Sequence, residues 1–131
     1  MNSPPPFSDL VAILPCNDLD ASERFYNRLG FTRSGAWQPP PGEPDNYRIL
    51  SNGEGAHLHL AEAVAGWLVR GKNPFGLYLH IEDVDGMAGR FAGEIIGGQA
   101  PEDKPWGMYE FAVTDPDETL VRVGRPIEPP R

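Results

Sequence analysis

The residues best suited to metal chemistry are His57 and His59, which alternate in a short apolar segment. Alternate residues of a β-strand project to one face, so both imidazoles could reach the same ion. A zinc-type site needs about three or four protein ligands, however, and the spacing of Glu54 and Glu62 gives no reason to bring them to these histidines. We therefore predict that this pair forms a polar cleft wall and holds no functional metal.

Cys16 is the only cysteine, so the sequence provides no internal disulfide. A nucleophilic thiol needs a neighbouring histidine or a helix start that lowers its pKa, and neither is evident around Cys16. A free cysteine also packs well as a small buried side chain. We predict a buried, unreactive thiol in a chain that resides in the cytoplasm.

Large amphipathic aromatic residues are the main candidates for a ligand site. They lie at predicted strand ends and in loops, away from any helical core stripe: Trp37, Tyr47, Trp67, Trp106 and Tyr109. Such rings can line a binding cleft, and they can equally belong to a core, because aromatic residues dominate both. Their positions alone leave both interpretations open.

The first half of the chain contains the elements that would position these residues. An apolar run at 10–14 predicts a strand, and Asp20 with Glu23 three residues later predicts a helix start. An apolar stripe follows along this helix, and Gly30 predicts its end. Further strands are predicted at 31–37, 46–51 and 56–61, with a proline loop at 39–41.

The second half repeats this order of elements. A strand is predicted at 77–81, and apolar residues at helical spacing then continue from Val84 to Ile95, before Gly97 and Gly98. The remaining strands are predicted at 99–102, 108–114 and 119–124.

The two halves align at a fixed spacing. The segment 14–20 matches 79–85, which lies 65 residues later, at the strand end, the acidic cap and the helix start. This repeat predicts two copies of one βαβββ unit. We expect one domain at 9–124, with modules at about 9–62 and 76–124, a flexible tail at 1–8 and a second tail at 125–131.

The composition is that of one globular domain of 131 residues, 40% hydrophobic and 23% charged. The net charge of −8 argues against nucleic-acid and anionic-membrane partners, which attract basic surfaces. No run approaches the ~20 apolar residues of a membrane span. The opening Met1 to Pro4 has neither the basic nor the apolar region of a secretory signal. These features also predict a cytoplasmic protein.

Three segments give the sequence its most specific character: Pro105 to Asp117, Leu19 to Tyr26 and Leu29 to Phe31. With them the chain resembles the glyoxalase, bleomycin resistance and extradiol dioxygenase superfamily, also called vicinal oxygen chelate proteins, and most closely its bleomycin resistance proteins. It departs at Tyr109, where such proteins often carry arginine, and at 118–119, where they usually have Gly-Asn. The resemblance implies an α+β fold of two βαβββ modules whose curled mixed sheets surround a cleft.

Enzymes of this superfamily bind a divalent metal through the first and last strand of each module. The matching positions here are Val11, His59, Gly76 and Arg122, of which only His59 has a suitable donor. A fixed guanidinium at the fourth position would repel a metal ion. The sequence therefore predicts a binding protein with no metal and no cofactor, and it assigns no catalytic residue.

The resemblance also implies where a ligand binds. In bleomycin resistance proteins the tryptophan that matches Trp106 stacks on the planar drug, and an aromatic residue faces it, for which Trp37 is the nearest equivalent. His59 and Arg122 would then line the floor. The complete predicted ligand set is Trp106, Trp37, His59, Arg122, Tyr109 and Tyr47.

We thus expect an antibiotic-resistance protein that sequesters an aromatic, cationic small molecule, such as a bleomycin-type glycopeptide, in the cleft of a homodimer. The acidic composition favours a cationic ligand. One alternative is a metal-dependent lyase, isomerase or dioxygenase of the same superfamily. Another is a binder of an unrelated metabolite, because a fold does not fix a function.

Overall fold

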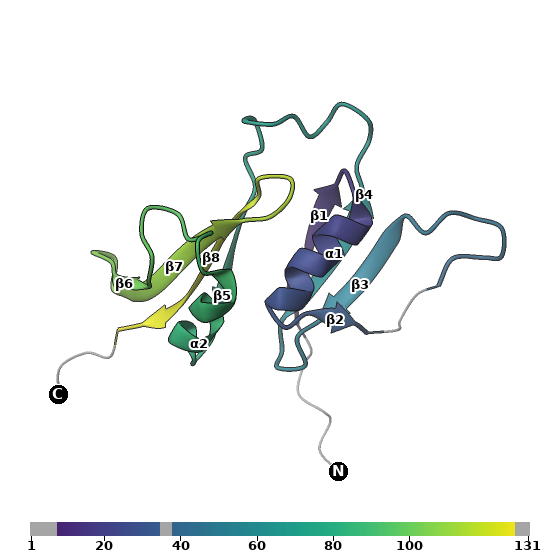
Figure 1. Cartoon of the computed structure of the whole chain (residues 1–131). Coiled ribbons are helices and arrows are strands. Elements are labelled where there is room, and N and C mark those ends of the chain that lie inside the picture. The colour runs from purple at the N-terminus through teal and green to yellow at the C-terminus, as the bar shows by residue number, and fades with distance from the viewer. Residues whose placement is uncertain (1–7, 35–37, 128–131) are drawn as a thin grey trace, which may run out of the picture.

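The computed structural model describes residues 8–34 and 38–127, which form two four-stranded sheets with a helix on each (Figure 1). The first module contains β1 (Ala12–Cys16), α1 (Leu19–Arg28), β2 (Thr32–Arg33), β3 (Tyr47–Ser51) and β4 (His57–Glu62). The second contains β5 (Gly76–His80), α2 (Val84–Ala88), the short 3₁₀ helix η1 (Gly89–Phe91), β6 (Glu102–Asp103), β7 (Met108–Thr114) and β8 (Leu120–Pro126).

Both sheets have the same topology, which confirms the predicted α+β fold of two βαβββ modules. The strand orders are β1-β4-β3-β2 and β5-β8-β7-β6, and in each module the first strand pairs in parallel with the last. Ile13 lies beside His59 in the first sheet, as Tyr78 lies beside Arg122 in the second. The 65-residue alignment of the first strands therefore holds in three dimensions.

Helix α1 ends as predicted and begins differently. Gly30 adopts the left-handed φ of 94° that closes the helix. The N-cap is Asp18, whose carboxylate accepts from the backbone N–H of Ala21 at 3.1 Å, so the prediction of Asp20 was wrong. Glu23 does not reach back to the cap, because its carboxylate binds Arg33 and Arg48 instead.

The second helical segment is much shorter than its apolar spacing predicted. The helical turns end at Phe91, and Gly93 follows with a φ of 83°, so Ile95 lies outside the helix. Glycine costs about 1 kcal/mol relative to alanine in a helix interior, and this segment contains Gly86 and Gly89. The prediction of a helix that reaches Gly97 was therefore wrong.

Most strands match their predicted ranges to within two residues. β7 matches 108–114. In the part of the predicted strand 31–37 that the structure describes, only Thr32 and Arg33 form a strand, and the backbone N–H of Ser34 adds one bond to Ile49 of β3. β8 continues to Pro126, so two residues of the expected tail belong to the sheet. The other tail residues lie mostly outside the described ranges.

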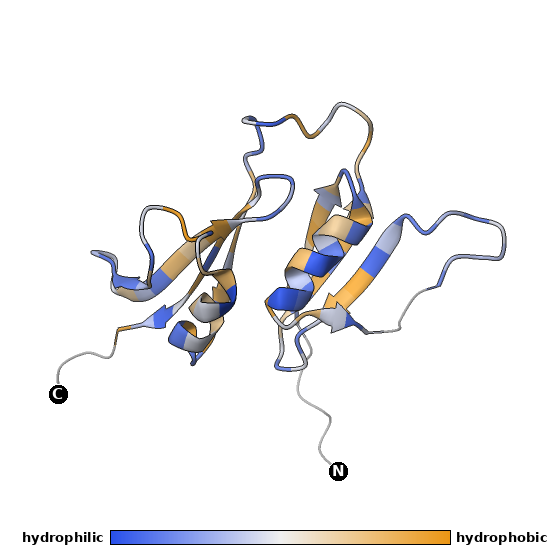
Figure 2. Cartoon of the chain, in the orientation of Figure 1, coloured by the Kyte–Doolittle hydropathy of each residue, from blue (hydrophilic) through white to orange (hydrophobic). Residues whose placement is uncertain are grey.

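A single core joins the modules. Phe91 is fully buried and packs against Phe25 of α1, with ring centroids 5.7 Å apart, and against Phe111 of β7, at 6.2 Å. The Tyr26 hydroxyl donates to Asp115 across the same junction at 2.8 Å. Figure 2 shows the hydrophilic outer side of α1 and the apolar strands behind it. The modules are therefore packed as one body.

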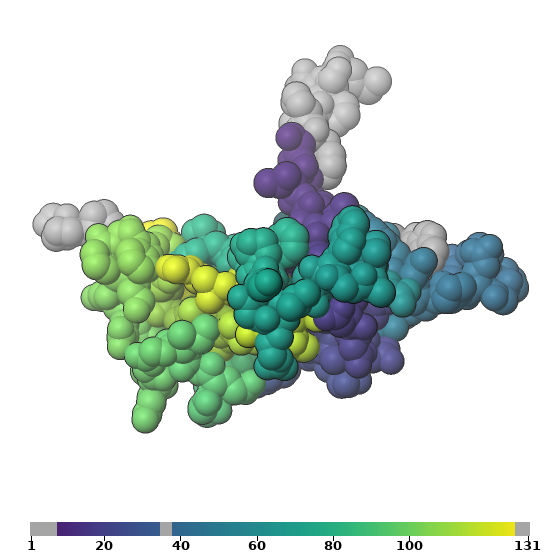
Figure 3. Space-filling model, turned by 90° about the horizontal axis from the view of Figure 1, so that it is seen from above, coloured from purple at the N-terminus to yellow at the C-terminus, as the bar shows by residue number. Residues whose placement is uncertain are grey.

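Each helix covers one face of its own sheet, and we call the uncovered faces the open faces. In β4 the residues alternate between core positions, Leu58 and Leu60, and open-face positions, such as His59. The linker 63–75 crosses between the modules (Figures 1 and 3). Within the described ranges, no helix is long and apolar enough to cross a bilayer.

Candidate ligand-binding site

On the open face of the second sheet, the ring of Trp106 lies beside a group of three polar side chains, which are Glu110, Arg122 and Tyr78. Trp106 lies in the turn before β7, where Gly107 adopts a φ of 84°. Its Nε1–H donates to Glu110 Oε1 at 2.7 Å. Arg122 Nη1 donates to Glu110 Oε2 at 3.3 Å, and its Cζ lies 5.3 Å from the centre of the Trp106 ring. Trp106 and Arg122, both predicted ligand residues, are therefore adjacent.

Glu110 and Tyr78 belong to this group, although the sequence did not single them out. The Tyr78 hydroxyl donates to Glu110 Oε1 at 3.2 Å. Burial, together with the negative charge of Glu110, raises the pKa of Tyr78 to about 12, so this hydroxyl stays protonated at neutral pH. Two sequence patterns could have identified these residues. The alternation of β7 puts Glu110 on the face opposite to that of the core residue Phe111, and Tyr78 aligns with Ile13 of the first module.

A cavity of about 310 Å³ opens beside this group. Trp106, Glu110, Ala112 and Arg122 form one side of it. The other side is formed by the loop before β6, with Ile95, Ile96, Gly98 and Ala100, and by Glu102 of β6 and the following Lys104. Trp106 keeps 55% of its surface exposed. The ring is thus held by its edge and presented to solvent, as a stacking platform requires.

The first sheet carries a different pair on its open face. The Tyr47 hydroxyl lies 2.6 Å from His59 Nδ1, and the two rings meet edge to face with centroids 5.3 Å apart. Both residues are predicted ligand residues. Tyr47 and Glu110 occupy equivalent places, because each lies beside the corresponding residue of the last strand, Ala61 or Gly124. Within the described residues, no hydrogen bond, ion pair or aromatic pair joins Tyr47 or His59 to Trp106.

The other aromatic candidates are placed elsewhere. Tyr109 donates its hydroxyl to Asp85 of α2, on the helix-covered face of the sheet. Trp67 lies in the linker and lines an apolar cavity of about 510 Å³ with Ile13, Pro15 and Phe75. Trp37 lies outside the described residues. The structure therefore brings together only part of the predicted ligand set within one chain.

The four positions that hold metal in related enzymes do not provide a metal site here. Val11 precedes β1, Gly76 begins β5, and His59 and Arg122 lie on the last strands. Only His59 offers a donor atom, and Arg122 is a cation bonded to Glu110. No group of three His, Cys, Asp or Glu side chains suited to a metal occurs among the described residues. The donor set does not fit a divalent ion.

Cys16 is fully buried, and its thiol donates to the carbonyl of Leu14 at 3.4 Å. Burial raises its pKa to about 11. A protonated, inaccessible thiol is a poor nucleophile, which agrees with the structural role predicted for Cys16.

Comparisons with known proteins extend these observations. The family model described as Glyoxalase/Bleomycin resistance protein/Dioxygenase superfamily matches residues 9–123. A comparison with curated proteins gives no match.

Solved structures share the fold. A bleomycin-binding protein complexed with bleomycin is 27% identical, with a TM-score of 0.70 over 91% of this chain and 98% of that one. A bleomycin resistance determinant encoded on the transposon Tn5 is 26% identical, with a TM-score of 0.71 over 92% and 98%. An antibiotic-binding protein from Streptomyces sp. CB03234, 22% identical over 92% and 97% with a TM-score of 0.68, shows the fold alone.

Proposed function

The chain belongs to the glyoxalase/bleomycin resistance protein/dioxygenase superfamily, and from this premise we propose that it binds a planar aromatic small molecule of the bleomycin type, without metal and without catalysis. The binding-protein part of this proposal is supported by the bleomycin-binding and bleomycin resistance proteins that share its fold at 27% and 26% identity. Sequestration of the molecule would by itself protect a cell.

The observation that carries the proposal is the geometry of Trp106. Its ring is held by the bond to Glu110, remains largely exposed, and borders a cavity. Offset stacking of a flat ligand contributes about 0.5–1.5 kcal/mol beyond burial. Arg122 retains N–H groups besides the one bonded to Glu110, and these suit a carbonyl or carboxylate oxygen on the ligand.

We also propose that the ligand carries a cationic group. The net charge of −8 attracts cations to the surface. Within the cavity, a cation would avoid Arg122 and lie near the exposed carboxylate of Glu102, where it would compete with Lys104, whose Nζ lies 3.3 Å from that carboxylate. The ligand would therefore bind with its ring at Trp106 and its positively charged group toward Glu102 of β6.

The proposed binding unit is a homodimer, in which the first module of one chain faces the second module of its partner. Large apolar side chains remain exposed on the open faces, including Ile13, Tyr78 and Trp106. Burial of such surface favours association. In this arrangement Tyr47 and His59 of one chain would complete the cavity at Trp106 of the other. We place this dimer in the cytoplasm, because its only cysteine is a free thiol.

Tryptophan fluorescence titrations test the function directly. Metal-free bleomycin, metal-loaded bleomycin and a panel of aromatic metabolites are compared, and we expect saturable quenching by metal-free bleomycin at one site per chain. Tighter binding of a metabolite than of bleomycin would favour the alternative that the protein binds an unrelated metabolite. One equivalent of a divalent metal that survives dialysis, with an activity lost on chelation, would favour the enzyme. Light scattering should give twice the chain mass of 14.4 kDa, and a monomer would contradict the shared cleft.

A further inference from the structure

One buried carboxylate organises the surroundings of Trp106. Glu110 is only 2% exposed, although it belongs to the open face of β7. It is the most buried carboxylate in the described part of the chain. An ionised carboxylate is costly to bury unless hydrogen-bond donors or cations satisfy its oxygens, so its partners reveal what it does.

The partners come from three separate parts of the module. Trp106 precedes β7, Tyr78 lies on β5 and Arg122 lies on β8. Their donor atoms lie 2.7, 3.2 and 3.3 Å from the Glu110 oxygens. Two of these side chains, Trp106 and Arg122, also line the cavity. The carboxylate therefore connects the cavity wall to the sheet.

The sheet leaves room for this arrangement at one glycine. A Cβ atom at Gly124 would lie 2.5 Å from the Tyr78 hydroxyl and 2.6 Å from Glu110 Cβ. Either contact would force a shift, so the missing side chain at Gly124 provides the space that the carboxylate and the hydroxyl fill. The equivalent residue of the first module is Ala61, which lies beside Tyr47 where Gly124 lies beside Glu110.

We propose that Glu110 is a positioning residue for ligand binding, which holds the indole of Trp106 by its Nε1–H edge and Arg122 by its guanidinium. This inference rests on the proposed function, since it concerns the same cavity. Glu110 itself is too buried to act as the main ligand contact. Its role is to fix the direction in which the ring of Trp106 and the N–H groups of Arg122 meet the ligand.

Two substitutions separate the hydrogen bond from simple filling of space. Glu110→Leu fills similar volume without an acceptor. It leaves Arg122 without its anion, but that side chain is 40% exposed, so water can solvate its guanidinium. Glu110→Gln keeps an amide oxygen that can accept from Trp106 Nε1–H. The orientation of Trp106 is followed by fluorescence anisotropy and acrylamide quenching in chains that also carry Trp37→Phe and Trp67→Phe. Affinity for metal-free bleomycin is measured by calorimetry in chains with all tryptophans present.

We expect Glu110→Leu to lower the anisotropy of Trp106, to increase its quenching and to weaken bleomycin binding at least about tenfold. Glu110→Gln should restore the anisotropy and recover affinity to within about threefold of the unmodified protein. If Glu110→Leu does not fold, Glu110→Met provides the same contrast with Glu110→Gln.

Glu23→Leu is the matched control. Glu23 is also a largely buried carboxylate bonded to arginines, but it lies on α1, outside this cavity. Its loss should lower the melting temperature and leave the anisotropy of Trp106 and the bleomycin affinity unchanged. If Glu23→Leu and Glu110→Leu alter the signal of Trp106 alike, Glu110 has only a structural role.

The two proposals fail separately. If a folded Glu110→Leu protein keeps its Trp106 anisotropy and its bleomycin affinity, the positioning role is wrong while the binding function stands. If the unmodified protein does not bind bleomycin, the proposed ligand class is wrong. In that case the anisotropy and quenching measurements alone decide whether Glu110 positions Trp106.

Discussion

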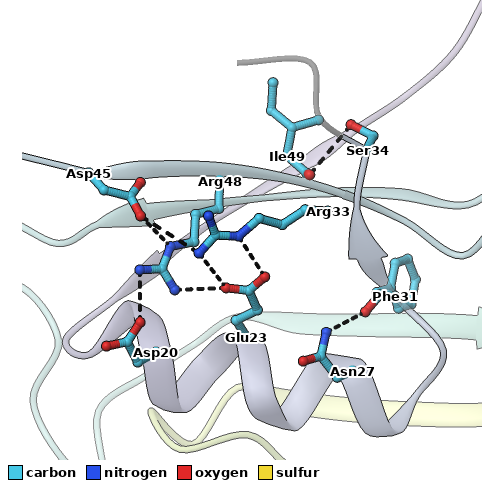
Figure 4. Close-up of polar contacts among 9 residues, drawn as sticks. All are labelled: Asp20, Glu23, Asn27, Phe31, Arg33, Ser34, Asp45, Arg48 and Ile49. Atoms are coloured by element: carbon cyan, nitrogen blue, oxygen red, sulfur yellow. Dashed lines mark hydrogen bonds and ion pairs between the residues drawn. The ribbon is translucent and has the colours of Figure 1, made fainter. Parts of the chain in front are cut away.

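The two modules share topology and register, yet their buried ion pairs lie on opposite sides of the sheets. In the first module the charges gather on the helix side, where Arg48 of β3 binds Asp20, Glu23 and Asp45 (Figure 4). In the second module the equivalent position is occupied by the core residue Phe111. There the charged pair lies on the open side instead.

The open faces show the same divergence at equivalent positions. Tyr47 and His59 form a hydrogen bond that needs no net charge, whereas Glu110 and Arg122 form an ion pair. The first module therefore uses its charges to fasten α1 and the base of the loop before β3 to the sheet. The second uses them to shape a cavity. If the proposed ligand binds in this cavity, the two copies of one architecture separate the tasks of scaffold and binding site.

Phe91→Ala should have the largest effect on stability, because it removes the side chain at the centre of the core that joins the two modules. Phe91 packs between Phe25 and Phe111, and truncation of a buried phenylalanine typically costs about 3–5 kcal/mol. Chemical denaturation should show this loss for the whole chain. The exposed Ile96 gives the control, since Ile96→Ala should cost far less. A loss below about 1 kcal/mol for Phe91→Ala would mean that the modules are stable without their joint core.

Arg48→Met tests the scaffold role of the first module. Arg48 is 9% exposed and binds three carboxylates. Its removal takes away the cation of Asp20 and leaves Glu23 and Asp45 with Arg33 alone. We expect a loss of about 3 kcal/mol in the free energy of unfolding, at the low end for a broken buried ion pair, because Asp20 and Asp45 are partly solvated. Bleomycin affinity should stay unchanged. A large loss of affinity would break the division of tasks between the modules.

The pH dependence of Glu23 sharpens the same comparison. The hydrogen bonds and charges of Arg33 and Arg48 lower the pKa of Glu23 below its ordinary value of 4.5. The folded state therefore favours the ionised form, and this contribution is complete above pH 4.5 and is lost as the pH falls through the folded pKa. Glu23→Gln should cost about 1–2 kcal/mol at pH 7. The difference from the unmodified protein should shrink in acid, and a constant difference would contradict the assignment.

Trp106→Ala should have the smallest effect on stability and a clear effect on binding. The ring is largely exposed, and water can replace its bond to Glu110, so the melting temperature should change little. Binding of a planar ligand should weaken at least about tenfold, or roughly 1.4 kcal/mol. Trp67→Ala, in the linker, is expected to matter less. Unaltered affinity of Trp106→Ala for a confirmed ligand would remove the second module's binding role.

Local patterns predicted most of the fold. The apolar and polar alternation of β7 and the glycine that ends α1 are properties of neighbouring residues, and the 65-residue repeat compares two such local patterns. Asp18 was missed as the N-cap because three acidic or cap-forming residues compete near that helix start. The length of α2 was overestimated because its apolar spacing suggested a helix that its glycines do not sustain.

The site was less predictable because its partners are distant in sequence. Trp106 and Arg122 were predicted from motif positions, and the structure places them together. Glu110 was visible only as part of a motif, since its partner Tyr78 lies 32 residues away and the space at Gly124 appears only when three strands are assembled. A local sequence pattern cannot predict the space that Gly124 leaves for Glu110, because these residues are distant in sequence.

The parallel pairing of first and last strands also bears on how the chain folds. Ile13 meets His59, and Tyr78 meets Arg122, so each sheet closes a loop of about 45 residues before those strands can join. Such long-range pairing slows folding, and mixed topologies of this kind fold more slowly than helical bundles. The entropic cost of closing a loop rises only slowly with its length. Insertions in the loop around residues 39–41 should therefore lower the free energy of unfolding only slightly. As the chain leaves the ribosome, the first module can close once β4 has emerged, and the joint core around Phe91 must wait for β7 and β8.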